Sequence, residues 1–491
     1  MIQSPKDQPT IGHKAQWMSA IACCAATALI ALFSNAPIYA QDTADILITG
    51  GHVFDTESGS FKPNSGITVT KKRFVAVGAD KDSKAKQTIQ LKDSQYILPG
   101  LIDCHAHYNM TLFRKRREEL KYMPIIYLAN GATVTFSCGE YDPEGMLKLR
   151  KRIESGEQIG PRLLTSGPYF GRVRPGWRRD KPEQEIRDEV DFWAKQGTAG
   201  FKAKAIDPDS LRVLIDQAHK HNLTVTGHLD SGFRGSVNPR DAITMGIDRI
   251  EHFLGGDAMP ANQSAYRSLK DIKSGTPAFE KICKHFIDND VYFDCTLSAY
   301  GYLGETTPET HEEYEYWIDE REFFTPHVQE IVKKRKPRKG MELYQAVYRA
   351  KQTTIADFHK AGGTITLGTD HNSNGNHLPG FGVHRELDAL VRNGIPAADA
   401  IKIATINGAR AFGIEKDHGS IQSGKIADLV IIEGNPLEKI RNTRNVQQVM
   451  RAGKIHDPKK LFEMAKGKIG PASKEEAVSY THLTLPTNYT V

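Results

Sequence analysis

The stretch DSLRVLIDQAHKHNLTVTGHL, residues 209–229, decides the fold. Its first two thirds have the apolar spacing of a helix, and LTVTGHL predicts a strand that follows at once. The same order, a helical segment and then a short strand, returns at IDRIEHF (247–253), VYFDCTL (291–297) and TITLGTD (364–370). Repeated units of this kind indicate α/β architecture, with a parallel sheet whose faces are covered by helices.

The length of the middle of the chain sets the size of this sheet. Residues 97–412 are enough for a (β/α)8 TIM barrel with insertions, and we predict that fold. An open, doubly wound sheet is the alternative, although we find no GxGxxG loop between a strand and a helix. Strand-like runs near both ends, at 45–55 and 419–434, predict a small β-sandwich domain formed from residues 41–96 and 413–458.

Composition excludes several classes of protein. Of the 491 residues, 39% are hydrophobic and 25% are charged, which is an ordinary globular balance. The net charge of +6 is spread along the chain, and its two basic runs, FRKRRE (113–118) and KKRKPRK (333–339), are typical of solvated helix faces. We therefore expect no nucleic-acid partner. The cysteines beyond the N-terminal segment are too few for a disulfide framework.

The N-terminus has the pattern of a bacterial-type signal peptide. Lys6 and Lys14 precede an apolar run at 18–33, and Ala40 stands at a suitable cleavage point. We predict that residues 1–40 are a signal peptide and that the mature protein is exported, to the periplasm or beyond. The apolar run is short for a membrane span, so we expect no stable span after cleavage, although an uncleaved anchor stays an alternative.

The C-terminal end carries a different kind of signal. We predict a tail over residues 459–491. Within it, VSYTHLTLPT (478–487) resembles the translation of an adapter used in sequencing libraries, which indicates an artefact. A natural disordered tail is the alternative.

Residues that bind metals stand at the ends of the predicted strands. His105 and His107, in HAH, close an apolar run and, at i and i+2 on a strand, face the same way. His228, His252 and Asp370 each follow the apolar part of a later strand. Barrel enzymes build their sites at this C-terminal end of the strands, so we expect the five side chains to meet there.

The segment GFKAKAID (200–207) places Lys202 and Lys204 on one face of a strand. A buried ammonium is costly unless it is paired or chemically altered. Lys202, His228 and His252 follow one another at about the length of a βαβ unit, roughly 30 residues, which predicts strands 4, 5 and 6. HAH then lies on strand 1 and Asp370 on strand 8. The surplus length after strand 7, around 299–345, predicts a lid or substrate wall.

Together, these motifs resemble the amidohydrolase superfamily over residues 45–455. LPGLIDCHAH is similar to its first-strand signature, and GSIQSGKIADLVII and ATINGARAFG (404–413) are similar to its closing segments. VTGHL, IEHF, LGTD and GVHRELDALVRNGI (382–395) resemble most closely the branch that contains imidazolonepropionase-like and prolidase-like hydrolases.

The resemblance implies a binuclear metal centre with a carboxylated lysine. Lys202 would be that lysine, with Lys204 as the alternative, and its carbamate would bridge two divalent metal ions. His105, His107 and Asp370 would bind one ion, and His228 and His252 the other. Zinc suits this donor set best, while manganese, cobalt and iron stay open. A bridging water would ionise, with Asp370 as general base and then general acid.

The implied function is that of an enzyme, a metal-dependent hydrolase acting on carbon–nitrogen bonds, peptide bonds included. We expect an amide or peptide substrate such as an acyl-amino acid or a dipeptide. A hydrolase of lactones, cyclic amides or phosphoesters, a deaminase, and a non-catalytic metal-binding protein stay as alternatives; Lys202, and LDSG after His228, argue against a deaminase. The oligomeric state stays open, with a homo-oligomer as one alternative. The candidate substrate-binding residues are Tyr108, Arg172, Arg174, Lys204 and His384.

Overall fold

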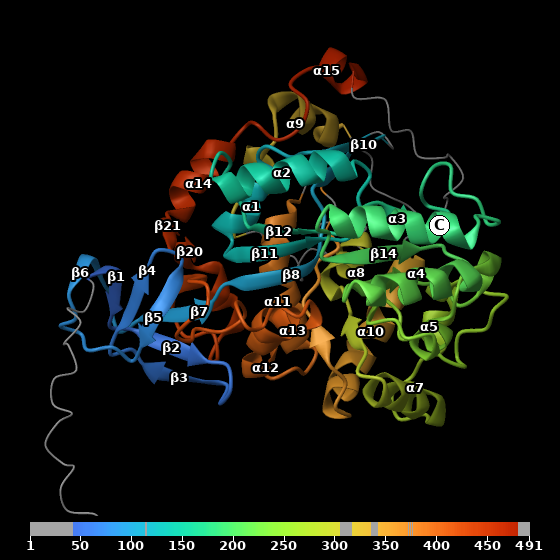
Figure 1. The fold of residues 1–491 in the computed structure, drawn as a ribbon, viewed down its shortest axis with the longest axis horizontal. Coiled ribbons are helices and arrows are strands. Elements are labelled where there is room, and N and C mark those ends of the chain that lie inside the picture. Colours follow the sequence, from blue (N-terminus) through green and yellow to red (C-terminus); the bar gives the residue numbers. More distant parts are fainter. Residues whose placement is uncertain are drawn as a thin grey trace, which may run out of the picture. The chain divides into compact units, whose positions relative to one another are not determined.

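The computed structural model describes residues 43–112, 115–304, 317–334, 342–371, 373, 375 and 377–479. All described helices and strands belong to the unit Ala44–Val491 (Figure 1). The predicted signal peptide (1–40) lies outside the described residues, and so does the predicted adapter-derived segment from residue 480 onwards. Between residues 43 and 479, no described helix is long and apolar enough to cross a membrane.

Strands from both ends of the chain form two sheets. The first has the order β5 (Arg73–Val77), β4 (Ile67–Thr70), β1 (Ala44–Thr49), β6 (Ala85–Gln90). The second has the order β21 (Lys454–His456), β20 (Val446–Arg451), β19 (Leu429–Glu433), β7 (Gln95–Pro99), β2 (His52–Asp55), β3 (Ser60–Pro63). Within it, β19 and β7 pair antiparallel with Ile431 opposite Ile97, so the N-terminal and C-terminal segments meet in one sheet.

These two sheets contribute to one cluster of buried apolar side chains. Ile48 and Val69 come from the first sheet, while Ile97 and Ile431 come from the second. Alternation along each strand turns such residues to one face, and removing that face from water stabilises the pair of sheets.

The central part of the chain forms parallel strands joined by helices, so the chain belongs to the α/β class. One sheet has the order β12 (Arg162–Thr165), β11 (Ala132–Ser137), β8 (Leu101–Ala106). The other has the order β13 (Tyr169–Phe170), β14 (Gly200–Lys204), β15 (Thr224–His228), β16 (Arg249–Glu251), β17 (Tyr292–Asp294), β18 (Ile365–Thr366). In this order β14 and β15, which carry Lys202 and His228, are neighbours, and His252 directly follows the next strand, β16, as the spacing predicted.

Hydrogen bonds also connect the two parallel sheets. The Cys104 amide donates to the Leu367 carbonyl at 2.8 Å, and the Asp370 amide donates to the His105 carbonyl at 2.9 Å. These two bonds place the end of β8 and the segment after β18 side by side. The two sheets are also continuous along the chain, because only residues 166–168 separate β12 from β13.

One or more helices lie between most successive parallel strands and after the last one. They are α1 (Met123–Ala129), α2 (Pro143–Ser155), α3 (Glu183–Lys195), α4 (Pro208–Lys220), α5 (Pro239–Thr244), α6 (Ala265–Ser268), α7 (Pro277–Asp288), α8 (Leu297–Gly304), α9 (Pro326–Lys333), α10 (Glu342–Lys360), α11 (Gly382–Arg392), α12 (Ala397–Lys402) and α13 (Gly408–Ala411). In Figure 1, α2 runs beside β12 and α4 beside β14.

Helix α4 shows why these segments are helical. The Asp207 carboxylate accepts the Ser210 amide, and Pro208 fills the first turn, where its missing N–H is not needed. Leu211, Leu214 and Ala218 then recur at helical spacing and are buried. A polar cap and an apolar stripe together place the helix against the sheet.

Two segments differ from the sequence predictions. The basic run at 113–118, predicted to be a solvated helix face, contains β10 (Lys115–Glu118), which forms a hairpin with β9 (Asn109–Leu112). Most of the second basic run, from residue 335, lies outside the described residues. The predicted tail begins with α14 (Pro458–Ala465) and continues to α15 (Lys474–Ser479). Between these helices Ile469 is fully buried, and its carbonyl accepts the Thr325 amide at 3.0 Å.

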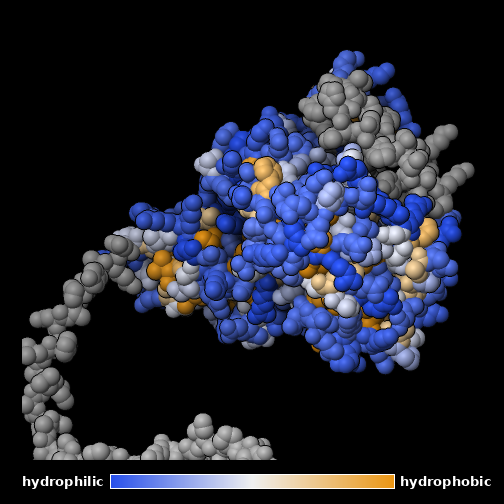
Figure 2. Space-filling model, turned by 45° about the vertical axis from the view of Figure 1, so that its right-hand side comes forward, coloured by the Kyte–Doolittle hydropathy of each residue, from blue (hydrophilic) through white to orange (hydrophobic). Residues whose placement is uncertain are grey.

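Few large apolar side chains are exposed. Val75, Val77, Phe192, Ile287 and Met464 stand out among the described residues, and they are scattered over β5, α3, α7 and α14. Figure 2 shows a face that is mostly hydrophilic, with separate small hydrophobic areas. This face has no broad apolar area for docking a partner.

Candidate metal centre

The strand ends bring five of the predicted ligands together. His105 and His107 come from β8 and the residue after it, His228 ends β15, His252 follows β16 and Asp370 follows β18. Asp370 Oδ1 lies 2.9 Å from His107 Nε2 and 3.4 Å from His105 Nε2, and Asp370 Oδ2 lies 3.9 Å from His252 Nε2. The rings of His228 and His252 are 4.5 Å apart. Residues far apart in the sequence therefore form one cluster of donors.

Two polar side chains orient the histidine rings. His105 Nδ1 lies 3.0 Å from Asp294 Oδ2, and His252 Nδ1 lies 2.8 Å from Thr296 Oγ1. Because Nδ1 is engaged on this outer side, Nε2 of each ring faces Asp370. Hydrogen bonds of this kind commonly fix the tautomer and the direction of metal-binding histidines. The sequence analysis missed Asp294 and Thr296.

The backbone is also unusual at this cluster. His252 has φ 64° and Asp370 has φ 45°, in the left-handed region that non-glycine residues rarely adopt. The His252 amide donates to the Asp294 carbonyl, and the Asp370 amide donates to the His105 carbonyl, both at 2.9 Å. These bonds hold the two residues in a conformation that turns their side chains towards one another. Such outliers are typical of functional sites.

Lys202 is buried beside the cluster, with 2% of its surface exposed. Its ammonium donates to Glu251 Oε2, and Cys138 Sγ lies 3.4 Å away. Glu251 Oε2 is in turn 3.6 Å from His252 Nε2 and 3.8 Å from His105 Nδ1. Burial alone would raise the pKa of Glu251, but the charge of Lys202, with the neighbouring histidines, holds it well below its usual value. Glu251 and Cys138 are further residues that the sequence analysis missed.

The histidines are suited to bind a cation. Burial lowers the pKa of His107 to about 4 and holds the pKa values of His228 and His252 well below the usual value, so these rings are neutral at pH 7. Burial would also lower the pKa of His105, but its interactions with Cys138, Glu251 and Asp370 raise it well above that value. A cation that binds His105 therefore displaces a proton.

The donor chemistry fits a divalent transition metal. The donor atoms of His105, His252 and Asp370 lie within 4.8 Å of one another, and imidazole with carboxylate is a common zinc donor set. A second group, His105, Cys138 and Glu251, meets the same distance limit and is fully buried. Both groups contain His105, so they adjoin.

The candidate substrate-binding residues are divided between this centre and the rest of the fold. Lys204 ends β14, directly opposite His228 in the register, and burial lowers its pKa to about 8. Tyr108 is buried, with its hydroxyl 2.6 Å from Thr135 Oγ1. Arg174 pairs with Glu189. The Arg172 Nε donates to the Ala205 carbonyl at 3.3 Å. His384, on α11, has its Nδ1 3.2 Å from Thr443 Oγ1. Lys204 is thus the candidate that lies opposite a proposed ligand in the strand register.

Aromatic residues form a wall beside the centre. The Tyr266 ring lies 6.3 Å from the His228 ring, and the Tyr300 ring lies 5.7 Å from the His252 ring. Lys351 donates to the His252 carbonyl, with its ammonium 4.4 Å from the centre of the Tyr300 ring. Rings packed against the histidines exclude water from this side of the centre.

Arg116, on β10, is another residue that the sequence analysis missed. Its guanidinium lies 4.7 Å from the centre of the Tyr141 ring. Its charge helps to lower the pKa values of His107 and Lys204, after the larger effect of burial, so it is close to the centre. The available signal was a dense basic run directly after the HAH strand.

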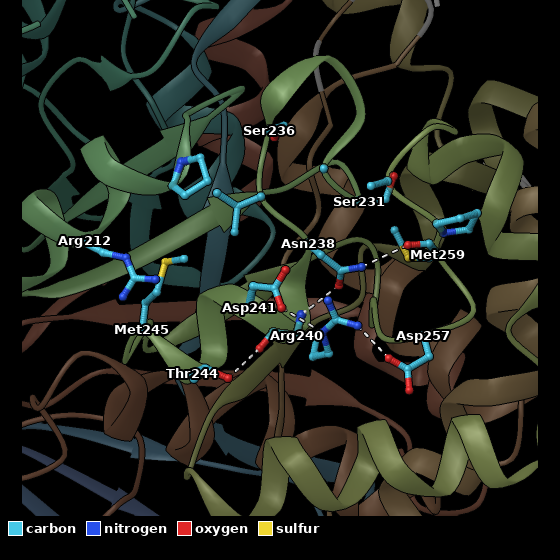
Figure 3. Close-up of a pocket in the computed structure, with 15 residues that line it drawn as sticks. Arg212, Ser231, Ser236, Asn238, Arg240, Asp241, Thr244, Met245, Asp257 and Met259 are labelled. Atoms are coloured by element: carbon cyan, nitrogen blue, oxygen red, sulfur yellow. Dashed lines mark hydrogen bonds and ion pairs between the residues drawn. The ribbon is translucent and has the colours of Figure 1, made fainter. Parts of the chain in front are cut away.

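A cavity of about 500 Å³ lies elsewhere, between the loops that follow β15 and β16 and helices α4 and α5 (Figure 3). Arg240 lies at its wall, 2.8 Å from Asp241 and 2.6 Å from Asp257. None of the six predicted metal ligands lines this cavity. This cavity is therefore separate from the cluster of candidate metal ligands.

Comparisons with known proteins agree with this geometry. Residues 96–259 and 320–456 match the sequence profile of the amidohydrolase family. Ochratoxinase of Aspergillus niger is 22% identical over 482 residues, covering 85% of this chain and 88% of its own. The 5'-deoxyadenosine deaminase of Methanothermobacter thermautotrophicus is 23% identical over 417 residues, covering 80% and 85%.

Solved structures share the fold. A crystal structure of a Xaa-Pro dipeptidase with bound methionine in the active site has a TM-score of 0.62 and 22% identity, covering 84% of this chain and 99% of that one. The crystal structure of A. niger ochratoxinase has a TM-score of 0.61 and 19% identity, covering 87% and 100%. These likenesses extend over nearly the whole length of the other chains.

Proposed function

Since the chain belongs to the amidohydrolase family, we propose that it is a metal-dependent hydrolase that cleaves the amide bond of an acyl-amino acid or a dipeptide-like substrate. Family membership already makes it a hydrolase that acts on carbon–nitrogen bonds. One observation carries the finer proposal: four histidines and Asp370, from four different strands, converge within hydrogen-bonding or near-contact distance. Their chemistry suits a divalent metal better than any purely structural role.

The proposed centre takes two divalent ions, with zinc as the preferred metal. His105, His107 and Asp370 would hold one ion, and His228 and His252 would hold the other. Carboxylated Lys202 would be a ligand of both ions. When bound, such a pair of ions polarises the scissile carbonyl and makes a water ionise near neutral pH. Carboxylation would also turn the buried Lys202 cation into an anion, which suits a ligand shared by two cations.

The chain's own residues would orient the reactants and move protons. Asp370 is the proposed general base: its carboxylate accepts a proton from the attacking water and later returns one to the nitrogen of the leaving amine. Asp294 and Thr296 keep the His105 and His252 rings in place through their Nδ1 atoms. Tyr266 and Tyr300 shield the same space from bulk water.

We also propose that the parallel strands close into a (β/α)8 barrel over residues 97–412. The bonds from Cys104 to Leu367 and from Asp370 to His105 support closure, because they join the first and last strands of the series. The buried cluster shared by the two terminal sheets supports a β-sandwich domain from residues 41–96 and 413–458.

Export to the periplasm or beyond stays part of the proposal, on the N-terminal pattern of residues 1–40 alone. A small-molecule amide or peptide is the proposed partner. Mass measurement of the N-terminus of the protein purified from an outer compartment would test export: an intact Met1 there contradicts cleavage after residue 40.

A deaminase is the second candidate, because the chain is similar over most of its length to 5'-deoxyadenosine deaminase. The buried Lys202 beside the histidines favours the amide hydrolase, since it supplies the position for a bridging ligand.

The deciding experiment compares substrates on zinc-loaded protein. We expect release of amino acids from a panel of N-acyl-amino acids and dipeptides, and no ammonia from 5'-deoxyadenosine. Asp370→Asn should abolish the release, while Arg349→Gln, at an exposed site on α10, should not change it. Ammonia release without amide cleavage would establish the deaminase instead.

A further inference from the structure

Two cations near the proposed centre have no hydrogen-bond or ion-pair partner in the described part of the chain. No hydrogen bond or ion pair within the described part of the chain involves the side chain of Arg116 or that of Lys204. The Arg116 Nε is buried and has no hydrogen-bond partner. Buried donors are usually paired, so the Arg116 Nε is available to bind a ligand.

The hairpin that carries Arg116 is fixed to the metal centre. The Thr111 amide, on β9, donates to the Ser373 carbonyl at 2.8 Å, and Ser373 lies in the segment directly after Asp370. Arg116 is opposite Thr111 in the register of the hairpin. The position of its backbone is therefore set by contacts with the same segment that supplies Asp370.

Aromatic rings support the guanidinium. It lies 4.7 Å from the centre of the Tyr141 ring, and that ring lies 5.1 Å from the Tyr169 ring. Tyr169 is paired with Lys202 in the register of β13 and β14. A cation–π contact of this kind restrains the plane of a guanidinium while leaving its N–H groups free.

Lys204 lies two residues beyond Lys202, on the same face of β14, and is opposite His228. Arg116 acts electrostatically on Lys204, and both act on Asp370, so the three charges are near one another. Glu118 is the other carboxylate that acts on Arg116, but no ion pair joins them. Lys202 and Glu251 also act on Lys204, so Arg116 and Lys204 add positive charge beside the proposed metal centre.

We propose that Arg116, together with Lys204, binds the α-carboxylate of the amine half of the substrate. The site would select amides whose leaving amine is an amino acid with a free carboxylate, and this inference rests on the proposed function. Arginine matches a carboxylate with two parallel N–H donors, and lysine adds a point charge. Arg172 and Arg174, the arginines predicted from the sequence, are engaged by the Ala205 carbonyl and by Glu189, so they do not compete for this role.

The test compares an N-acyl-amino acid with its C-terminal carboxamide, which differs only in the charge of the carboxyl end. For the free acid, we expect Arg116→Gln to lower kcat/KM roughly ten- to a hundredfold, mainly through KM, because a hydrogen bond to a charged group is lost. For the carboxamide, the same variant should behave like the wild type. Arg116→Lys should recover part of the loss, and Lys204→Gln should reproduce it in weaker form.

Two controls make the result decisive. Arg349→Gln removes an exposed arginine from α10 and should leave both substrates unchanged. Zinc content and the thermal unfolding of Arg116→Gln should equal those of the wild type; if that variant does not fold, Arg116→Lys and Lys204→Gln provide the comparison. The inference is overturned if the folded variants have the same ratio of kcat/KM for the free acid to kcat/KM for the carboxamide as the wild type.

A binding measurement separates this inference from the proposed function. Calorimetry with phenylalanine and phenylalaninamide detects the carboxylate site even if no amide is cleaved. Tighter binding of phenylalanine that disappears in Arg116→Gln would support the carboxylate site. If the same protein cleaves no amide, that second result refutes the proposed hydrolase and leaves the carboxylate site standing. Equal binding of the two compounds to the wild type would refute the carboxylate site.

Discussion

Replacing Asp294 should weaken metal binding, although Asp294 is not a proposed ligand. Its Oδ2 lies 3.0 Å from His105 Nδ1, and both side chains are almost completely buried. The carboxylate holds the ring in the tautomer whose Nε2 faces Asp370. Loss of an outer partner of this kind costs roughly 10–100-fold in metal affinity, about 1.4–2.8 kcal/mol.

Two substitutions separate the contribution of the Asp294 charge from that of its hydrogen bond. Asp294→Asn keeps the volume and removes the charge, so we expect about a tenfold loss of zinc affinity, at the lower end of the range for such partners. Asp294→Ala also removes the hydrogen bond and should lie near the upper end, about a hundredfold. Competition with a chromophoric zinc chelator measures both values.

The control variant must lose a carboxylate that has no contact with the proposed metal centre. Asp288→Asn is suitable, because Asp288 is exposed on α7 and is paired only with Lys284 at 2.8 Å. Its zinc affinity should equal that of the wild type. The reasoning fails if folded Asp294→Asn and Asp294→Ala both retain wild-type affinity, since His105 would then need no partner to face the metal.

Three further predictions follow from the described geometry. Lys202→Ala should lose bound zinc and amide hydrolysis together, as metal analysis and activity assays would show; retention of both would remove Lys202 from the centre. Gly368→Ala should weaken zinc binding, because a Cβ there would lie 2.1 Å from Asp294 Oδ1 and would displace that carboxylate; a chelator titration equal to wild type contradicts this. His384 is buried, and burial lowers its pKa from 6.5 to about 3, so the unfolded chain takes up a proton below pH 6.5 that the folded chain does not. This difference removes about 2 kcal/mol of stability at about pH 5. Urea unfolding of His384→Gln should depend less steeply on pH than that of the wild type over this range, and equal slopes would show that His384 is not responsible.

The candidate ligands could be named from the sequence because their signal is local. A histidine at the end of a strand has its position set by that strand, and the spacing of His228 and His252 matches the length of one helix–strand unit. Lys202 was found in the same way, from an ionised side chain on a strand face that the fold must bury.

Other residues could not be found from local patterns. Arg116 belongs to a basic run that resembles a solvated helix face, and only the contact between Thr111 and Ser373 places its hairpin beside the centre. Glu251 and Asp294 stand in short strands whose inward side is known only when the neighbouring strands are in place. The roles of Tyr108 and His384 as substrate-binding residues stay predictions, although both bond to threonines within the fold.

The pairing of β7 with β19 has a consequence for how the chain reaches its folded state. β7 is made early, with Ile97 and Leu98 ready to be covered, but its antiparallel neighbour β19 leaves the ribosome only after the whole central region. Until then, that edge of the sheet is open and apolar, and open apolar edges promote association between chains. Synthesis that stops between Asp370 and Leu429 would therefore yield a chain prone to aggregate, even though all the proposed metal ligands are present.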